Sequence, residues 1–240
     1  MASPLAAILR RLEPERRRIE DMERRFAELI REYDVRTKKK NYSQRLSDAL
    51  ARQLVTDLGR SFPGIEAGER RAGGRERPIR VDVRYHTPYG LGLGLSVKTL
   101  NFRDGKSRRY TENIQRVDKE LNAEAVQIHG YQPKAVLAAL FLMPEDARHD
   151  GERGRSSFEH ALEVFRKRVG RADETQPGER FELFWVGTYA TDQERSGDTV
   201  LHDLEGYRSG GEVPPARSWE DFLEAVRCAY ERRFSVKLPR

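Results

Sequence analysis

One stretch of the chain places an acid, a serine and a lysine where two neighbouring strands would bring them together. From Arg77 to Thr99, apolar residues alternate with polar residues or glycine, and Pro88–Gly90 interrupts the alternation. This pattern predicts two antiparallel strands joined by a turn, each with one buried and one open face. If the pairing is centred on the middle residue of that turn, Asp82 lies opposite Ser96 on the open face, with Lys98 on the same face.

An acid and a lysine that share the open face of a sheet suit phosphodiester hydrolysis. The Asp82 carboxylate is the hard oxygen ligand that Mg²⁺ prefers, and Lys98 is placed to orient a water molecule as the nucleophile. Gly92 and Gly94 fall on the same face, which favours the close approach of another backbone such as that of DNA. The alternative interpretation is an ordinary cross-strand ion pair.

The surrounding elements are predicted from periodicity and capping residues. Helices are expected over 14–33, with Pro14 in its first turn, and over 43–62, separated by an exposed joint at Lys38–Lys40 and followed by a loop over 64–77. Further along the chain we expect a helix over 111–129, a doubly covered strand over 134–143, a helix capped by Ser156 and Glu159 with Val169 on its apolar stripe, strands over 181–189 and 199–204, and a last helix capped by Ser218.

This order of elements predicts an α/β fold in which helices flank a mixed β-sheet. We expect an N-terminal helical extension over residues 1–40, and a domain that carries the chemistry over residues 41–240.

The acid and lysine motif resembles that of the PD-(D/E)xK nucleases, which include most type II restriction endonucleases. The matching residues are Asp82 and Ser96-Val97-Lys98, with Pro78 four residues before the aspartate. The resemblance implies a restriction-endonuclease-like core of helix, three strands, helix and strand. Ser96 stands where the common pattern has an acid.

One subgroup of these nucleases reads Ser-x-Lys, with the second acid displaced to the start of the following helix. Here 13 residues, Thr99–Thr111, separate Lys98 from Glu112, which is similar to that spacing. Glu124, which has a more inward helical phase, is the competing candidate.

The resemblance implies the following roles. Asp82 and Glu112 hold Mg²⁺, for which Mn²⁺ is expected to substitute. Lys98 orients the water and Ser96 supports the site. Asp48 on the first core helix assists, with Asp57 as its rival.

A basic loop follows the strand that carries Lys98 (the lysine strand) and is the predicted DNA-binding segment. The chain carries a formal net charge of +6, with a pI near 9.5, which permits nucleic-acid binding. Arginine can bind guanine and aspartate can accept from cytosine. The residues expected to contact DNA are Arg103, Asp104, Lys106, Arg108, Arg109 and Arg116.

Composition excludes some classes of protein. The chain has no apolar run of the roughly 20 residues that a membrane span needs, and charges from Arg10 onward argue against a secretory signal. Cys228 is the only cysteine, which favours a reducing, cytoplasmic location.

The expected function is therefore that of a Mg²⁺-dependent DNA endonuclease resembling type II restriction enzymes, in host restriction-modification and phage defence. Its expected partners are double-stranded DNA, further copies of itself as a homodimer or tetramer, and a cognate methyltransferase or defence-system partner. Two alternatives are a non-catalytic nucleic-acid-binding module on the same fold, and a nuclease subunit that a defence-system partner activates.

Overall fold

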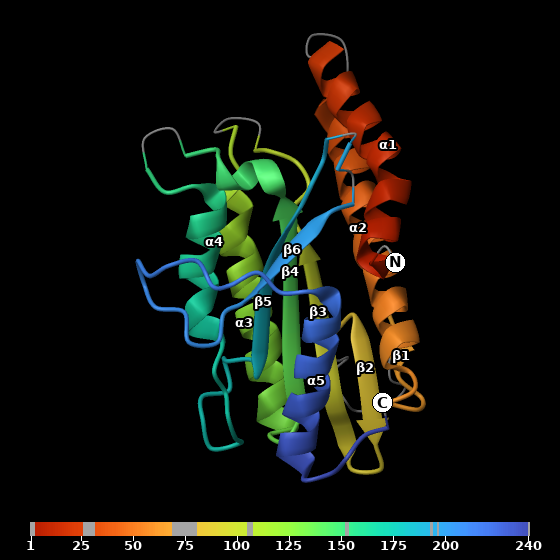
Figure 1. Cartoon of the computed structure of the whole chain (residues 1–240), viewed down its shortest axis with the longest axis vertical. Coiled ribbons are helices and arrows are strands. Elements are labelled where there is room, and N and C mark those ends of the chain that lie inside the picture. The colour runs from red at the N-terminus through yellow and green to blue at the C-terminus, as the bar shows by residue number, and fades with distance from the viewer. Residues whose placement is uncertain are drawn as a thin grey trace.

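A computed structural model of the chain describes residues 3–25, 32–68, 81–104, 108–151, 154–192, 194–195 and 197–239. In these residues a six-stranded mixed sheet is flanked by five α-helices, which confirms the predicted α/β class (Figure 1). No helix within this part of the chain is long and apolar enough to cross a bilayer.

The strands lie side by side in their order along the chain. They are β1 (Glu66–Ala67), β2 (Val83–Thr87), β3 (Gly90–Thr99), β4 (Val136–Pro144), β5 (Leu183–Tyr189) and β6 (Thr199–Asp203). The pairs β3–β4 and β4–β5 are parallel, and the other three are antiparallel. The parallel pairs need crossover helices, and α3 (Thr111–Tyr131) and α4 (Ser157–Phe165) supply them.

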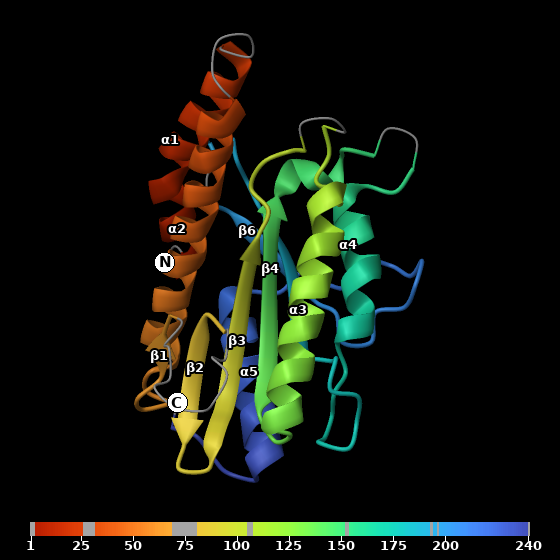
Figure 2. The same cartoon turned by 180° about the vertical axis from the view of Figure 1, so that it is seen from behind.

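The helices form two layers, one on each face of the sheet. The helices α3 and α4 cover one face, whereas α1 (Pro4–Arg25), α2 (Glu32–Leu58) and α5 (Trp219–Phe234) cover the other (Figure 2). Two apolar clusters fill the spaces between sheet and helices. All nine residues of β4 are buried, as predicted for a strand covered on both faces.

The N-terminal helices differ from the prediction. The helix α1 begins at Pro4 and contains Pro14 within it, and the expected joint at Lys38–Lys40 lies inside α2. Leu5 and Leu9 are buried in the same apolar cluster as the sheet, so tertiary packing outweighs the cost of an internal proline. The boundary predicted at residue 40 therefore falls within a continuous helix.

The N-terminal part of α2 and the C-terminal part of α1 project past the body of the molecule (Figure 1). Further down α2, four leucines at helical spacing are fully buried, and they are Leu46, Leu50, Leu54 and Leu58. Within the helix expected over 14–33, the apolar residues Phe26, Leu29 and Ile30 lie outside the described residues.

Local capping signals proved reliable. Ser156 with Glu159 and Ser218 with Asp221 each form a reciprocal capping box at the start of α4 and α5. The helix α4 ends at Phe165, however, and Val169 pairs with Phe181 in an isolated β-bridge instead of extending the helical stripe.

The register of the β2–β3 hairpin is the predicted one. Val83 pairs with Leu95 and Arg84 with Gly94, and a bulge near the turn shifts the last two pairs by one residue. The prediction of one open face is wrong for β3. Gly94 and Ser96 are buried on the face that α3 covers, where Ser96 contacts Glu124. Gly92 is also buried, but it faces the opposite layer, because a Cβ at this position would meet Tyr230 of α5.

Candidate active site

Asp82 directly precedes β2 and extends its pairing with β3. Its backbone N–H donates to the carbonyl of Leu95 at 3.0 Å. Its carboxylate Oδ2 accepts from the backbone N–H of Val97 at 2.7 Å. The side chain of Asp82 is therefore fixed against the segment that carries Ser96 and Lys98, as the hairpin pattern predicted.

Ser96 and Lys98 face α3, and Glu124 of that helix meets both. Lys98 Nζ lies 3.6 Å from Glu124 Oε2, and Ser96 Oγ donates to Glu124 Oε1. Ser96 is 1% exposed, and the side chains of Glu124 and Lys98 are 8% and 25% exposed. Glu124 reaches the sheet because it follows Leu121 by three residues on the buried stripe of the helix.

The electrostatics of Glu124 are unusual for a carboxyl group. Burial and, to a smaller extent, the negative charge of Asp82 together raise the pKa of Glu124 to about 8, against the opposing effect of Lys98. At neutral pH Glu124 is therefore mostly protonated, because one lysine does not compensate for its burial beside a second acid. Strongly shifted groups of this kind gather at functional sites.

The donor set of this cluster fits a Mg²⁺ ion. Magnesium is commonly held by one or two carboxylates, with water and substrate phosphate completing its shell. Asp82 and Glu124 supply two carboxylates that interact electrostatically across the same site. The residues that the structure describes contain no group of three or more His, Cys, Asp or Glu side chains that could hold a metal ion.

The structure does not bring Glu112 into this cluster. Glu112 is exposed in the first turn of α3, 12 residues before Glu124, which corresponds to roughly 18 Å along the helix axis. Of the two candidates for the second acid, it is therefore Glu124 that contacts Ser96 and Lys98.

The acids proposed from the first core helix lie elsewhere. Asp48 is half-buried and accepts from Gln44 Nε2, one turn earlier on α2, at 2.8 Å. Asp57 accepts from Trp219 Nε1 at 2.8 Å and so ties α2 to α5. Asp57 is thus a packing residue, and Asp48 keeps a partner on its own helix.

In the loop between β3 and α3, the side chains of Asp104 and Arg103 are held by contacts within the protein. Asp104 is buried, and its carboxylate accepts from the backbone N–H of Glu112 at 3.0 Å and from Asn113 Nδ2 at 2.9 Å. It therefore satisfies the first turn of α3 instead of facing outward. Arg103 is exposed and forms an ion pair with Asp146 at 2.8 Å.

The other predicted DNA-contacting residues are distributed over this end of the molecule. Arg108 is exposed with a positive φ of 57°, and Arg109 is half-buried and donates to the carbonyl of Arg155. Arg116 is exposed on α3 and pairs with Glu120 at 2.5 Å. Lys106 lies outside the described residues.

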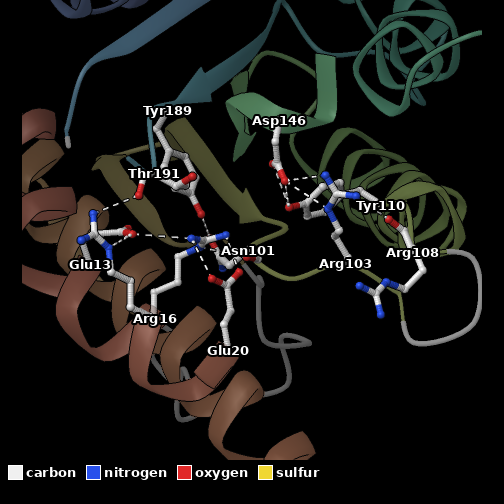
Figure 3. A network of polar contacts seen from close by, with 11 residues as sticks. Glu13, Arg16, Glu20, Asn101, Arg103, Arg108, Tyr110, Asp146, Tyr189 and Thr191 are labelled. Atoms are coloured by element: carbon white, nitrogen blue, oxygen red, sulfur yellow. Dashed lines mark hydrogen bonds and ion pairs between the residues drawn. The ribbon is translucent and has the colours of Figure 1, made fainter. Parts of the chain in front are cut away.

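A buried polar network beside the strand end was missed from the sequence (Figure 3). Arg16 of α1 is 3% exposed and donates through Nε to the carbonyl of Asn101 at 3.2 Å. The signal was present, because Arg16 lies three residues before the buried Ile19 and seven after the buried Leu9. Placing the helix start at Pro14 concealed that phase.

Comparison with known proteins adds no relative. The chain matches no family model, no curated protein and no solved structure.

Proposed function

We propose that this protein is a metal-dependent nuclease that hydrolyses phosphodiester bonds in DNA, of the PD-(D/E)xK type. The observation that carries the proposal is the cluster of Asp82, Lys98 and Glu124, in which two carboxylates and an ammonium group share one partly open site between β3 and α3. An ordinary surface ion pair does not explain a glutamate that is buried beside a second acid.

The order of the elements supports the same proposal. The series α2, β1, β2, β3, α3 and β4 follows the order of helix, three strands, helix and strand that the sequence resemblance implies. Asp82 stands at the start of one strand and Lys98 near the end of its neighbour, as in the motif. Glu124 would take the part of the displaced acid in place of Glu112.

The proposed mechanism assigns a separate task to each side chain. Lys98 donates a hydrogen bond to a water molecule, whose oxygen attacks phosphorus as the P–O bond to the leaving ester oxygen breaks. The proton that the water loses passes to bulk water, and the leaving oxygen takes up a proton from bulk water. Ser96 holds the Glu124 carboxylate in position. A Mg²⁺ ion held by Asp82 and Glu124 would lower the pKa of the water and offset charge on the phosphoryl oxygens.

The proposed substrate is double-stranded DNA, with Arg103, Arg108 and Arg109 near the end of the lysine strand as phosphate contacts. Cutting both strands requires two active sites, so we also propose a symmetric homodimer or tetramer. A role in restriction or phage defence follows if cleavage is sequence-specific.

The direct test is cleavage of unmethylated phage DNA in Mg²⁺ by the wild type and matched variants. We expect Asp82→Asn, Lys98→Ala and Glu124→Gln each to reduce the cleavage rate by at least about 100-fold, since each removes a group that would hold the metal ion or orient the attacking water. Glu112→Gln, which changes the same residue type on the same helix, is the control and is expected to keep activity within about threefold.

Three results would contradict this assignment in different ways. Equal activity of wild type and Glu124→Gln would remove Glu124 from the site. Loss of activity in Glu112→Gln, with the folded state intact, would restore the spacing-based candidate. A wild type that binds DNA in a salt-dependent manner without cutting it would favour the non-catalytic module, or the subunit that a partner activates.

A further inference from the structure

Asn101, three residues after Lys98, is held by four different elements of the fold. Its Nδ2 donates to Ser43 Oγ of α2 and to Thr99 Oγ1 of β3, both at 2.9 Å. Its Oδ1 accepts from Tyr189 Oη of β5 at 2.8 Å. Its carbonyl accepts from Arg16 of α1 (Figure 3). Every polar group of the Asn101 side chain is therefore used to fix the end of the lysine strand.

The partner from α1 is a buried charge with its own counter-ions. Arg16 Nη2 lies 2.8 Å from Glu20, and Arg16 Nη1 lies 3.5 Å from Glu13. Arg17 extends the contact by donating to the carbonyl of Thr191 beyond β5, at 3.1 Å. Buried ion pairs often add little stability compared with apolar packing of the same volume, so stability alone does not account for this one.

Phe102, the residue that follows Asn101, also contacts both α1 and α2. Phe102 packs edge-on against Tyr42 of α2, with ring centroids 5.4 Å apart. The charged groups of Arg16 and Lys39 lie 6.0 Å and 5.4 Å from the centre of the Phe102 ring. Two consecutive residues after the lysine strand therefore dock on the helical pair α1–α2.

We propose that Asn101 and Arg16 are positioning residues for Lys98, so that the helical pair α1–α2 is a working part of the active site. This inference rests on the proposed nuclease function. The chain from Lys98 to Asn101 has little freedom once Leu100 N–H donates to the Leu142 carbonyl at 2.9 Å and Asn101 is held on all sides. Lys98 is thereby kept at a fixed position along β3, opposite Glu124.

The physical reason for such support is the sensitivity of catalysis to position. Displacing a reacting group by about 1 Å can lower a rate by about 100-fold. Lys98 is on the last part of β3, where a strand normally frays, and its side chain is partly exposed. Without the Asn101 contacts, the strand end would keep its pairing with β4 but lose its fixed relation to α1, α2 and β5.

The test uses two substitutions at the network and two matched controls. Tyr189→Phe removes one hydroxyl from Asn101, and Arg16→Met removes the charged contact from α1. The controls are Tyr131→Phe and Arg18→Met, which make the same changes at exposed positions on α3 and α1. Steady-state cleavage gives kcat and KM for DNA, and amide hydrogen exchange of the full chain reports on residues 99–102.

We expect Tyr189→Phe and Arg16→Met to lower kcat about tenfold, with KM for DNA changed less than about twofold, because the phosphate contacts remain while Lys98 loses its fixed position. Exchange at residues 99–102 should become at least about tenfold faster, and both controls should match the wild type in both readouts.

The outcomes separate this inference from the nuclease proposal. Faster exchange at residues 99–102 with an unchanged kcat would overturn the positioning role, and so would unchanged exchange in Tyr189→Phe, the milder of the two variants. A wild type that never cleaves DNA contradicts the proposed function and, with it, the positioning of Lys98 for catalysis. Exchange then still decides whether the network holds the strand end.

Discussion

Two buried glutamates in this protein have similar exposure and opposite chemistry. Glu182, immediately before β5, is 5% exposed and contacts Arg171 at 2.8 Å, Arg233 at 2.7 Å and the backbone N–H of Leu137 at 2.7 Å. Burial alone would raise the pKa of Glu182, but His129, the Leu137 N–H and Arg233 outweigh it and hold that pKa below its ordinary value.

Glu124 is buried almost as deeply but has one lysine at 3.6 Å, one serine hydroxyl, and a second acid nearby. Its pKa is raised to about 8 instead of lowered. The difference between the two pKa values shows which carboxylate has enough positive charge and hydrogen-bond donors around it to stay ionised when buried. Glu182 belongs to a structural ion cluster in which Arg171 and Arg233 balance its charge. Glu124 has too little positive charge nearby to stay ionised at neutral pH, which suits a site that binds a cation.

The largest effect that we expect from this comparison is on stability at Glu182. Replacing Glu182 with Gln would leave Arg171 and Arg233 buried without their counter-ion, which should cost about 3–5 kcal/mol of unfolding free energy. Urea denaturation at pH 7 measures it, with Glu174→Gln as the control at an exposed position. A loss of unfolding free energy below about 1 kcal/mol would show that Glu182 is not a required counter-ion of Arg171 and Arg233.

An effect of comparable size and opposite sign is expected at Glu124. Because its folded pKa is raised from 4.5 to about 8, the carboxyl favours the folded state below pH 4.5, and this contribution is lost as pH rises through 8. Glutamine imitates the protonated form at every pH. Glu124→Gln should therefore be within about 1 kcal/mol of the wild type near pH 5 and gain about 4 kcal/mol of stability relative to it by pH 9, in the absence of divalent metal.

The measurement is urea unfolding of both proteins with a chelator present, at intervals between pH 5 and pH 9. Glu112→Gln is the control, because Glu112 is exposed on the same helix. A stability difference between wild type and Glu124→Gln that stays constant across this range would show that the pKa of Glu124 is not raised. Glu124 and Glu182 would then not differ in the way described above.

Local patterns predicted much of the fold. The alternation around Pro88–Gly90 predicted the hairpin and its register, and Ser156 and Ser218 predicted two helix starts, because these signals depend on neighbours in sequence. The extent of α1 was not predictable in the same way. Its first turns are stabilised by contacts between Leu5, Leu9 and distant parts of the core.

The candidate site was predicted in part, for the same reason. Asp82, Ser96 and Lys98 were found because strand parity places them on one face. Glu112 was preferred over Glu124 on spacing along the chain, whereas the distance between a helix and a strand depends on how the intervening loop is folded. Asp104 was expected to face DNA, yet it is buried at the start of α3, a role that the sequence did not reveal.

The most direct test of the central claim is Mg²⁺ binding measured by calorimetry in two buffers of different ionisation enthalpy, at pH 7. Since Glu124 is mostly protonated there, a cation that binds Asp82 and Glu124 must displace a proton. Wild type and Glu112→Gln should release close to one proton for each Mg²⁺ bound, and Glu124→Gln should release none and bind more weakly. Equal proton release and affinity in Glu124→Gln and the wild type would contradict the claim that Asp82 and Glu124 form a metal-binding catalytic site.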